Sequence, residues 1–203
     1  MEQTCPHTNV SALNFIAAFF LAMLLGASLG GGLQARTRTG AGDMEEKDNV
    51  RRIEVEVGGG FIHGNSYGAN PSKIGMALFL EARNNFPGTP FDVSFQGMLG
   101  SFSRKNDNLT VNINGGVTVF GDYNWRLGRR AAPFAGVGAG MVFVESRGLS
   151  TAAVREKTFV FNPRIGVELF EHLRITLEYK WMKAPYSFLG LNVGFAFGGG
   201  RKS

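Results

Sequence analysis

Apolar and polar residues alternate along the stretch LTVNINGGVTVFGDYNWRL, residues 109–127. Counting from Leu109, every second residue is apolar or glycine, and most of the residues between them are polar. This period of two predicts a β-strand with two different faces. Because a strand in a globular protein is usually about five or six residues long, a strand of this length indicates an unusual environment.

The same period recurs after residue 50 and predicts eight strands in all. Short connections, such as FEH at 170–172, alternate with others, of which ESRGLSTAAVREK at 145–157 is the longest and the one we expect to protrude most. No helical period appears after residue 50. An even number of antiparallel strands, with both ends of the array on one side, predicts an all-β, up-and-down barrel. The expected strands cover residues 50–63, 73–84, 91–104, 109–127, 133–144, 158–170, 173–181 and 186–197.

The apolar face of these strands is too bulky for the inside of the barrel. The interior of an eight-stranded barrel holds only about a dozen side chains, and the other face carries mainly glycine, serine, asparagine and charged residues. We therefore expect an eight-stranded antiparallel transmembrane β-barrel with its apolar face toward lipid. In the strand over 109–127, this places Val111, Ile113, Val117 and Val119 outside, with Asn112, Asn114 and Thr118 in the lumen.

Strand length and backbone chemistry agree with that placement. A tilted strand needs about nine to eleven residues to cross a bilayer, and closing the sheet pairs every backbone group. The alternative is a soluble, lipocalin-like carrier with the apolar face inside.

Residues 11–33 form the only long apolar run of the chain. Its length and the small residues after it predict a signal peptide over 1–35, with cleavage near Ala35 or near Ser28. Residues 1–10 contain Glu2 and no lysine or arginine, so a retained membrane helix and a buried core helix stay open as alternatives. The expected organisation continues with a flexible lead-in (36–49), the barrel (50–199) and a tail (200–203).

Charged residues on the polar face are expected to line the lumen. Because an unpaired buried charge is costly, we expect a roughly balanced network of ion pairs that fills the barrel; a narrow polar path for solutes or ions is the alternative. Aromatic residues near strand ends, Tyr123 with Trp125 and Tyr179 with Trp181, are expected at the two membrane interfaces. The lumen set is Arg52, Glu54, Glu56, Glu81, Arg83, Asp92, Asp122, Arg126, Arg164, Glu168, Arg174, Glu178 and Lys180.

Composition narrows the function classes. The chain has 29 glycines and 18 phenylalanines among 203 residues, which favours an all-β protein. A net charge of +5 with interspersed signs argues against nucleic-acid binding. Cys5 is the single cysteine, so we expect no internal disulfide. His63 and His172 are predicted at opposite ends of the barrel, which argues against a hydrolytic triad, and we expect no metal, no cofactor and no enzymatic activity.

Two stretches resemble a known family. NPRIGVELFEHLRITLEY (162–179) and LGLNVGFAFGGG (189–200) are similar to the last strands of small outer-membrane β-barrel proteins, in particular the type abundant in Bacteroidetes-like Gram-negative bacteria. PFAGVGAG, from Pro133, resembles a strand of the same group. The resemblance covers residues 50–200 and implies a bacterial outer-membrane location. It also implies recognition by the assembly machinery through Asn192, Gly194, Phe195 and Phe197, although the chain ends in GGGRKS.

These patterns lead to a functional expectation. We expect a monomeric, porin-like outer-membrane protein that contacts membrane lipid and has a non-catalytic role in membrane integrity or surface interaction. A pore for small solutes or ions is the first alternative and the soluble carrier the second. A partner bound by the polar loops, HGNSYGANPS (63–72) and 145–157, is a further hypothesis.

Overall fold

The computed structural model describes residues 52–65, 72–105, 109–125, 130–148 and 152–198. The expected signal peptide, the lead-in and Arg126 lie outside these described residues. The described residues contain no helix long and apolar enough to cross a membrane. Eight strands are present: β1 (Ile53–Gly64), β2 (Ile74–Asn85), β3 (Phe91–Ser103), β4 (Thr110–Asn124), β5 (Ala131–Arg147), β6 (Val154–Leu169), β7 (Leu173–Lys180) and β8 (Phe188–Phe197).

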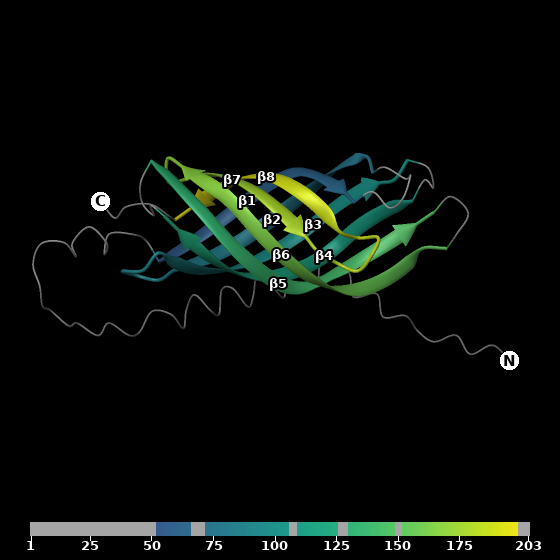
Figure 1. The fold of residues 1–203 in the computed structure, drawn as a ribbon, viewed down its shortest axis with the longest axis horizontal. Coiled ribbons are helices and arrows are strands. Elements are labelled where there is room, and N and C mark those ends of the chain that lie inside the picture. The colour runs from purple at the N-terminus through teal and green to yellow at the C-terminus, as the bar shows by residue number, and fades with distance from the viewer. Residues whose placement is uncertain (1–51, 66–71, 106–108, 126–129, 149–151, 199–203) are drawn as a thin grey trace, which may run out of the picture. The chain divides into compact units, whose positions relative to one another are not determined.

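Each strand pairs antiparallel with the next along the chain, and β8 pairs with β1 (Figure 1). The prediction of a closed, eight-stranded up-and-down barrel is confirmed. We call the end at which β1 begins and β8 ends the turn end; its connections span 86–90, 125–130 and 170–172. The opposite loop end has the connections 65–73, 104–109, 148–153 and 181–187.

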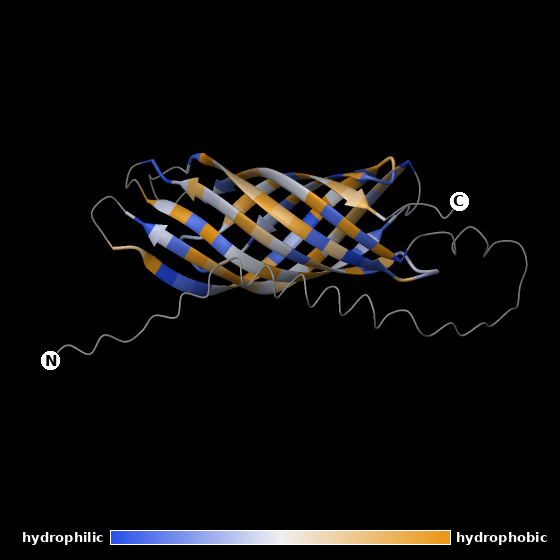
Figure 2. Cartoon of the chain, turned by 180° about the vertical axis from the view of Figure 1, so that it is seen from behind, coloured by the Kyte–Doolittle hydropathy of each residue, from blue (hydrophilic) through white to orange (hydrophobic). Residues whose placement is uncertain are grey.

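Large apolar side chains cover much of the outer wall. Alternate residues of every strand are exposed and mostly apolar, including Val57, Phe61, Leu78, Val137 and Ile165. Figure 2 shows the same alternation as orange and blue bands along the strands. Exposure of this many large apolar residues is unfavourable in water and is expected of a surface that faces lipid.

Strand β4 follows the predicted parity only in the half next to the turn end. There Val119 is 41% exposed, whereas Thr118 and Phe120 are buried in the lumen. Val117 is partly exposed. The outward placement of Val117 and Val119 is therefore confirmed.

The prediction is wrong for the loop-end half of β4. Val111 and Ile113 are buried, whereas Asn112 is partly exposed and Asn114 is exposed. The register between β4 and β5 shifts between Ile113 and Gly115, so β4 contains a β-bulge at this point. One extra residue exchanges the two faces of every residue beyond it. The alternation in the sequence continues without a break. On the loop-end side of the bulge, however, the apolar residues face the lumen and the polar residues face outward.

The bulge coincides with a change of surroundings on the outer wall. Beyond it, polar side chains of neighbouring strands pair on the outside: Ser101 Oγ donates to Asn112 Oδ1 at 2.8 Å, and Ser103 Oγ lies 3.3 Å from Thr110 Oγ1. Polar side chains outside and apolar side chains inside are the arrangement of a water-exposed barrel. We infer that the loop end of β3–β6 extends beyond the lipid tails.

The lumen at the loop end contains an apolar layer, which the expected polar lumen did not include. Its members are buried and in mutual contact, and Met182 and Tyr186 come from the connection between β7 and β8. These side chains pack against one another inside the barrel at the loop end. The layer consists of Ile62, Ala77, Phe79, Met98, Phe102, Val111, Ile113, Val142, Val144, Val160, Met182, Tyr186 and Phe188.

The connection between β5 and β6 is shorter than predicted. Glu145 pairs with Arg155 and Ser146 with Val154, so most of the expected 145–157 loop is strand. Arg155 Nε donates to Glu145 Oε2 at 2.8 Å and adds a cross-strand ion pair. Opposite charges on facing positions stabilise strand pairing, which explains why this polar segment extends the sheet.

The reversed parity of β4 can be tested with two substitutions. Ile113→Asn should lower the free energy of unfolding by about 2–5 kcal/mol, because it removes a buried side chain and places an amide in the apolar layer. Asn112→Val, one residue away on the outer wall, should cost about 1 kcal/mol, for the loss of the Ser101 hydrogen bond. Urea unfolding of the refolded protein in detergent measures both. Equal effects of the two variants would contradict the reversed parity.

Candidate functional site

Charged side chains gather in the lumen between the apolar layer and the turn end. They come from six of the eight strands, and each is at most 4% exposed. Each of these residues lies on the inward face of its strand. Because side chains alternate between the two faces of a strand, the period of two directs all of them toward the barrel axis. The charge cluster consists of Glu54, Glu56, Glu81, Arg83, Asp92, Asp122, Arg164, Glu168, Arg174, Glu178 and Lys180.

Arg83 lies at the centre of the carboxylates nearest the turn end. Its Nη1 is 2.8 Å from Glu54 Oε2 and 3.4 Å from Glu168 Oε2. Its Nη2 is 2.8 Å from Glu56 Oε2 and 3.3 Å from Glu81 Oε1. A fifth carboxylate, Asp92, lies 3.9 Å from Arg83 Nε. One guanidinium therefore holds together residues from β1, β2, β3 and β6.

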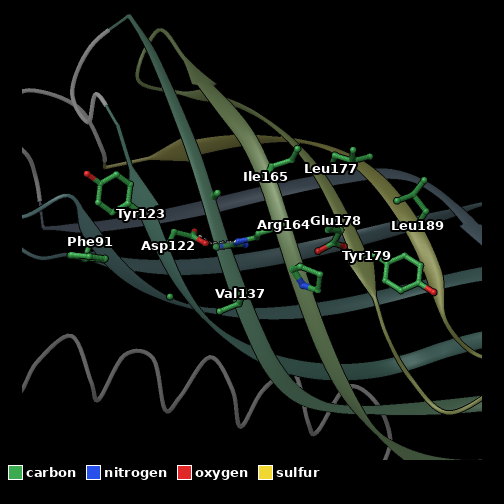
Figure 3. A pocket seen from close by; sticks show the side chains of 14 residues that line it. Phe91, Asp122, Tyr123, Val137, Arg164, Ile165, Leu177, Glu178, Tyr179 and Leu189 are labelled. Carbon is green, nitrogen blue, oxygen red and sulfur yellow. Dashed lines mark hydrogen bonds and ion pairs between the residues drawn. The ribbon is translucent and has the colours of Figure 1, made fainter.

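Arg164 joins this group to the middle of the lumen. Its Nη1 donates to Glu81 Oε2 at 2.6 Å, and its Nε donates to Asp122 Oδ1 at 2.9 Å. Arg174 Nη2 donates to the other oxygen of Asp122 at 3.0 Å. Figure 3 shows Arg164 directed toward Asp122, with the ion pair marked by dashes. Bidentate arginine–carboxylate pairs fix geometry as well as charge.

Lys180 and Glu178 form the part of the cluster nearest the apolar layer. Lys180 Nζ is 3.2 Å from Glu178 Oε2 and donates to Gln96 Oε1 at 3.0 Å. Glu178 also accepts hydrogen bonds from Asn162 at 2.9 Å and Asn192 at 3.0 Å. Glu178 thus accepts from one cation and two amides in the buried lumen.

Two inward phenylalanines stack on the guanidinium groups, and sequence reasoning missed their role. The Arg164 Cζ atom lies 3.6 Å from the centre of the Phe120 ring, and the Arg174 Cζ atom lies 3.5 Å from that of Phe134. Cation–π contact of this kind stabilises desolvated cations by about 2 kcal/mol. The available signal was that Phe120 and Phe134 occupy the polar parity of their strands, where a large aromatic residue is unexpected.

Among the described residues, the cluster has seven carboxylates and four cations. The predicted set had two more cations, of which Arg126 lies outside the described residues. Arg52 was expected in the lumen, but the structure places it exposed at the bend before β1. Buried acid is costly, and Arg83, Arg164 and Lys180 each contact more than one carboxylate or amide, whereas Arg174 pairs with Asp122 and stacks on Phe134.

The four aromatic residues expected at the interfaces lie at opposite ends of the barrel. Tyr123 and Trp125 lie at the turn end, where the Tyr123 ring packs edge-on against Phe91 (5.2 Å) and Trp125 (5.1 Å). Tyr179 and Trp181 lie at the loop end, where Asn65 Nδ2 donates to the Tyr179 hydroxyl at 2.5 Å. Whether these positions coincide with the membrane interfaces stays a prediction.

A hollow of about 660 Å³ lies between the strands from β4 to β8 (Figure 3). Small residues, Gly121 and Ala135, contribute to it, and outward side chains such as Tyr123, Val137 and Ile165 line it. Its lining is almost entirely apolar. This surface suits acyl chains rather than a polar substrate.

No arrangement for catalysis comes together in the residues that the structure describes. His63 ends the exposed face of β1 at the loop end, whereas His172 lies in the β6–β7 turn at the turn end, where its Nδ1 is 3.2 Å from the carbonyl oxygen of Ala196. Within the same residues, no group of three histidine, cysteine or acidic side chains has a geometry that could hold a metal ion.

Several solved structures of other proteins superpose on this chain. The structure of Neisserial surface protein A (NspA) superposes with a TM-score of 0.56 at 9% identity, covering 73% of this chain and 98% of that one. The N-terminal β-barrel domain of Pseudomonas aeruginosa OprF gives 0.48 at 14% identity, with 74% and 98% covered. Ail, the attachment invasion locus protein of Yersinia pestis, gives 0.44 at 12% identity, with 74% and 99% covered.

The chain thus has the fold of a small, eight-stranded outer-membrane β-barrel. At these identities, the similarity establishes the fold alone. No family model matches the sequence, and no curated protein matches it.

Removal of the central guanidinium should be the most damaging single change in the lumen. Arg83→Met is expected to lower the free energy of unfolding by about 3–5 kcal/mol, because it leaves buried carboxylates without their cation. Glu168→Gln should leave stability unchanged or raise it, since it reduces the acidic excess. Arg52→Met, at an exposed position, is the matched control and should have little effect. Urea unfolding in detergent, with the gel mobility of unboiled samples as the readout, measures the free energy of unfolding of all three variants. A small loss of stability in Arg83→Met would contradict the central role of Arg83.

Proposed function

We propose that the chain is an integral outer-membrane protein with a closed lumen, acting without catalysis in membrane integrity or surface interaction. The observation that carries this proposal is the filled interior. The charge cluster occupies the turn-end half and the apolar layer occupies the loop-end half. A barrel filled along its length offers its outer wall and its ends to partners, rather than its lumen.

Placement in a bilayer is supported by the outer wall. Exposed apolar residues cover strands from both halves of the barrel, and aromatic residues lie at each end. Such a belt with flanking aromatic girdles is what lipid requires of a transmembrane barrel. A soluble carrier would instead hide these residues and keep a ligand cavity inside, so the outer wall argues against the lipocalin-like alternative.

The pore alternative is opposed by the apolar layer. Ions cross a narrow passage only where polar groups or water replace their hydration. Phe79, Phe102 and Phe188 are buried in the layer, and the rings of Phe102 and Phe188 are 6.0 Å apart. The connection between β7 and β8 adds to the closure, since Ser187 Oγ donates to the Met182 carbonyl at 2.8 Å and holds the segment folded inward.

Two finer points of the proposal rest on the sequence resemblance. Phe195 and Phe197 are exposed on β8, whereas Asn192 and Gly194 face the lumen, which suits recognition of this strand by the barrel-assembly machinery. Membership in the Bacteroidetes-like type stays a prediction from the motifs at 133–140, 162–179 and 189–200. A monomeric state and a partner at the loops are likewise predictions.

Planar-bilayer recording tests the closed lumen. The wild-type protein should give no steady conductance, because the apolar layer leaves no hydrated path. The triple variant F79S/F102S/F188S removes the three rings and should raise ion leakage, provided that it keeps the gel mobility of a folded barrel when unboiled. Steady open channels from the wild-type protein would contradict a closed lumen and support the pore.

The cellular role is tested by deletion of the gene. If the protein supports membrane integrity, the deletion strain should take up hydrophobic dyes and detergents faster than the parent strain. If it acts in surface interaction, permeability should be unchanged and adhesion to cells or matrix should fall. Loss of neither property would contradict the proposed role.

A further inference from the structure

A group of cations lies on the outer wall of β5 and β6, where the apolar belt ends at the loop end. Along the outward face of β6, the residues run from Ile165 and Phe161 through Phe159 to Lys157 and Arg155. The first three are exposed and apolar or aromatic, and the last two are exposed and charged. The change from apolar to charged residues marks the boundary between lipid tails and head groups.

The cations on this boundary outnumber their acidic neighbours. Arg155 Nε is 2.8 Å from Glu145 Oε2, and Arg147 Nη2 is 3.5 Å from Glu145 Oε1. The side chains of Arg155 and Arg147 are 73% and 66% exposed, so most of their N–H groups face outward. Lys157 Nζ lies 5.6 Å from the centre of the Phe143 ring. Two arginines therefore share one carboxylate, and Lys157 adds a third cation beside them.

The neighbouring ion pair of the loop end is already balanced. Lys183, in the connection between β7 and β8, pairs with Glu156. The hydrogen bond and the charge of Glu156 raise the pKa of Lys183 above its ordinary value. This pair has no net charge, so the excess charge on this wall is carried by Arg147, Arg155 and Lys157.

We propose that Arg155, Lys157 and Arg147 bind the phosphate groups of a membrane lipid whose acyl chains pack on the wall below them. Phosphate is the anion present at the depth where lipid tails end, and arginine binds it through parallel N–H groups. On the same outward face of β6, Pro163 and Ile165 line the apolar hollow, a surface that fits acyl chains. This inference rests on the proposed placement of the barrel in a bilayer.

The outer wall at the turn end has different side chains from the outer wall at the loop end. Its outward side chains are largely aromatic, namely Phe86, Phe91, Tyr123, Trp125, Phe170 and Phe197. Among the described residues there, the exposed cations are Arg52 and Arg130, which lie outside the strands. Among the described strand residues, the exposed cations of the outer wall therefore lie at the loop end, whereas the outer wall at the turn end is aromatic.

Tryptophan quenching by brominated lipid tests the proposal. The full chain, carrying Trp125→Phe so that Trp181 at the loop end is the reporter, is reconstituted in phosphatidylcholine vesicles with increasing fractions of brominated phosphatidic acid. Because cations near a membrane surface attract anionic lipid, the wild-type preference for phosphatidic acid over phosphatidylcholine should be about tenfold or more. R155Q/K157Q should lower the ratio to about one.

Two further variants make the outcome specific. R52Q/R130Q removes the same charge at the turn end and should leave the preference unchanged. Glu145→Gln frees Arg155 and Arg147 from their carboxylate and should raise the preference, which a purely structural role for Glu145 would not do. A wild-type ratio near one, or an unchanged ratio in R155Q/K157Q, would overturn the proposal.

Failure of the phosphate site and failure of the membrane placement give different results. Quenching by brominated phosphatidylcholine with no preference for phosphatidic acid would refute the site and leave the transmembrane barrel intact. Absence of quenching by either brominated lipid would refute the placement itself. If R155Q/K157Q abolished binding of soluble dextran sulfate and left the lipid preference unchanged, the cations would instead be a site for a soluble polyanion.

Discussion

The structure depends on one constraint: a closed β-sheet has two faces, and the side chains of each strand alternate between them. Closure pairs every strand edge, which is compulsory where no water can satisfy the backbone. The chemistry of the two faces must then match two different surroundings along the whole length of the barrel. The outer wall meets lipid and then water, and the lumen must be filled at every level. The positions of the charge cluster, the apolar layer and the cations at the loop end all follow from how this chain meets that requirement.

The lumen is divided into two levels with different chemistry. In the turn-end half, arginines pair with the inward carboxylates, and two of them, Arg164 and Arg174, stack on Phe120 and Phe134. In the loop-end half, the outer wall of β3–β6 becomes polar, and the inside becomes apolar like the core of a soluble barrel. Because of the bulge near Gly115, one alternating sequence in β4 places polar residues in the turn-end lumen and apolar residues in the loop-end lumen. A filled interior directs the protein's contacts to its outer wall and its ends.

Much of the fold was predictable because the period of two is a strong local signal. All eight strands and their order follow from it, and Thr118, Val119 and the members of the charge cluster lie where the pattern places them. The reversal at Val111 and Ile113 was not predictable, since a bulge within Asn-Gly-Gly leaves the alternation of the sequence intact. The extension of the β5–β6 hairpin was missed because its outward residues are polar and show no apolar alternation. An ion pair between Arg155 and Glu145 links the two strands there. The exposed position of Arg52 was also missed, because whether a residue just before a strand faces the lumen is decided by three-dimensional context.

The most direct test of the orientation of the two faces is electron paramagnetic resonance of spin labels on single cysteines, introduced in a Cys5→Ser background. The labels are placed at residues 119 and 111 of the same strand, and their accessibility to oxygen in lipid and to a water-soluble nickel complex is measured in vesicles. The account predicts that the label at 119 is reached by oxygen and not by nickel, as expected in lipid, and that the label at 111 is reached by neither. Lipid exposure of the label at 111, or nickel access to the label at 119, would contradict it.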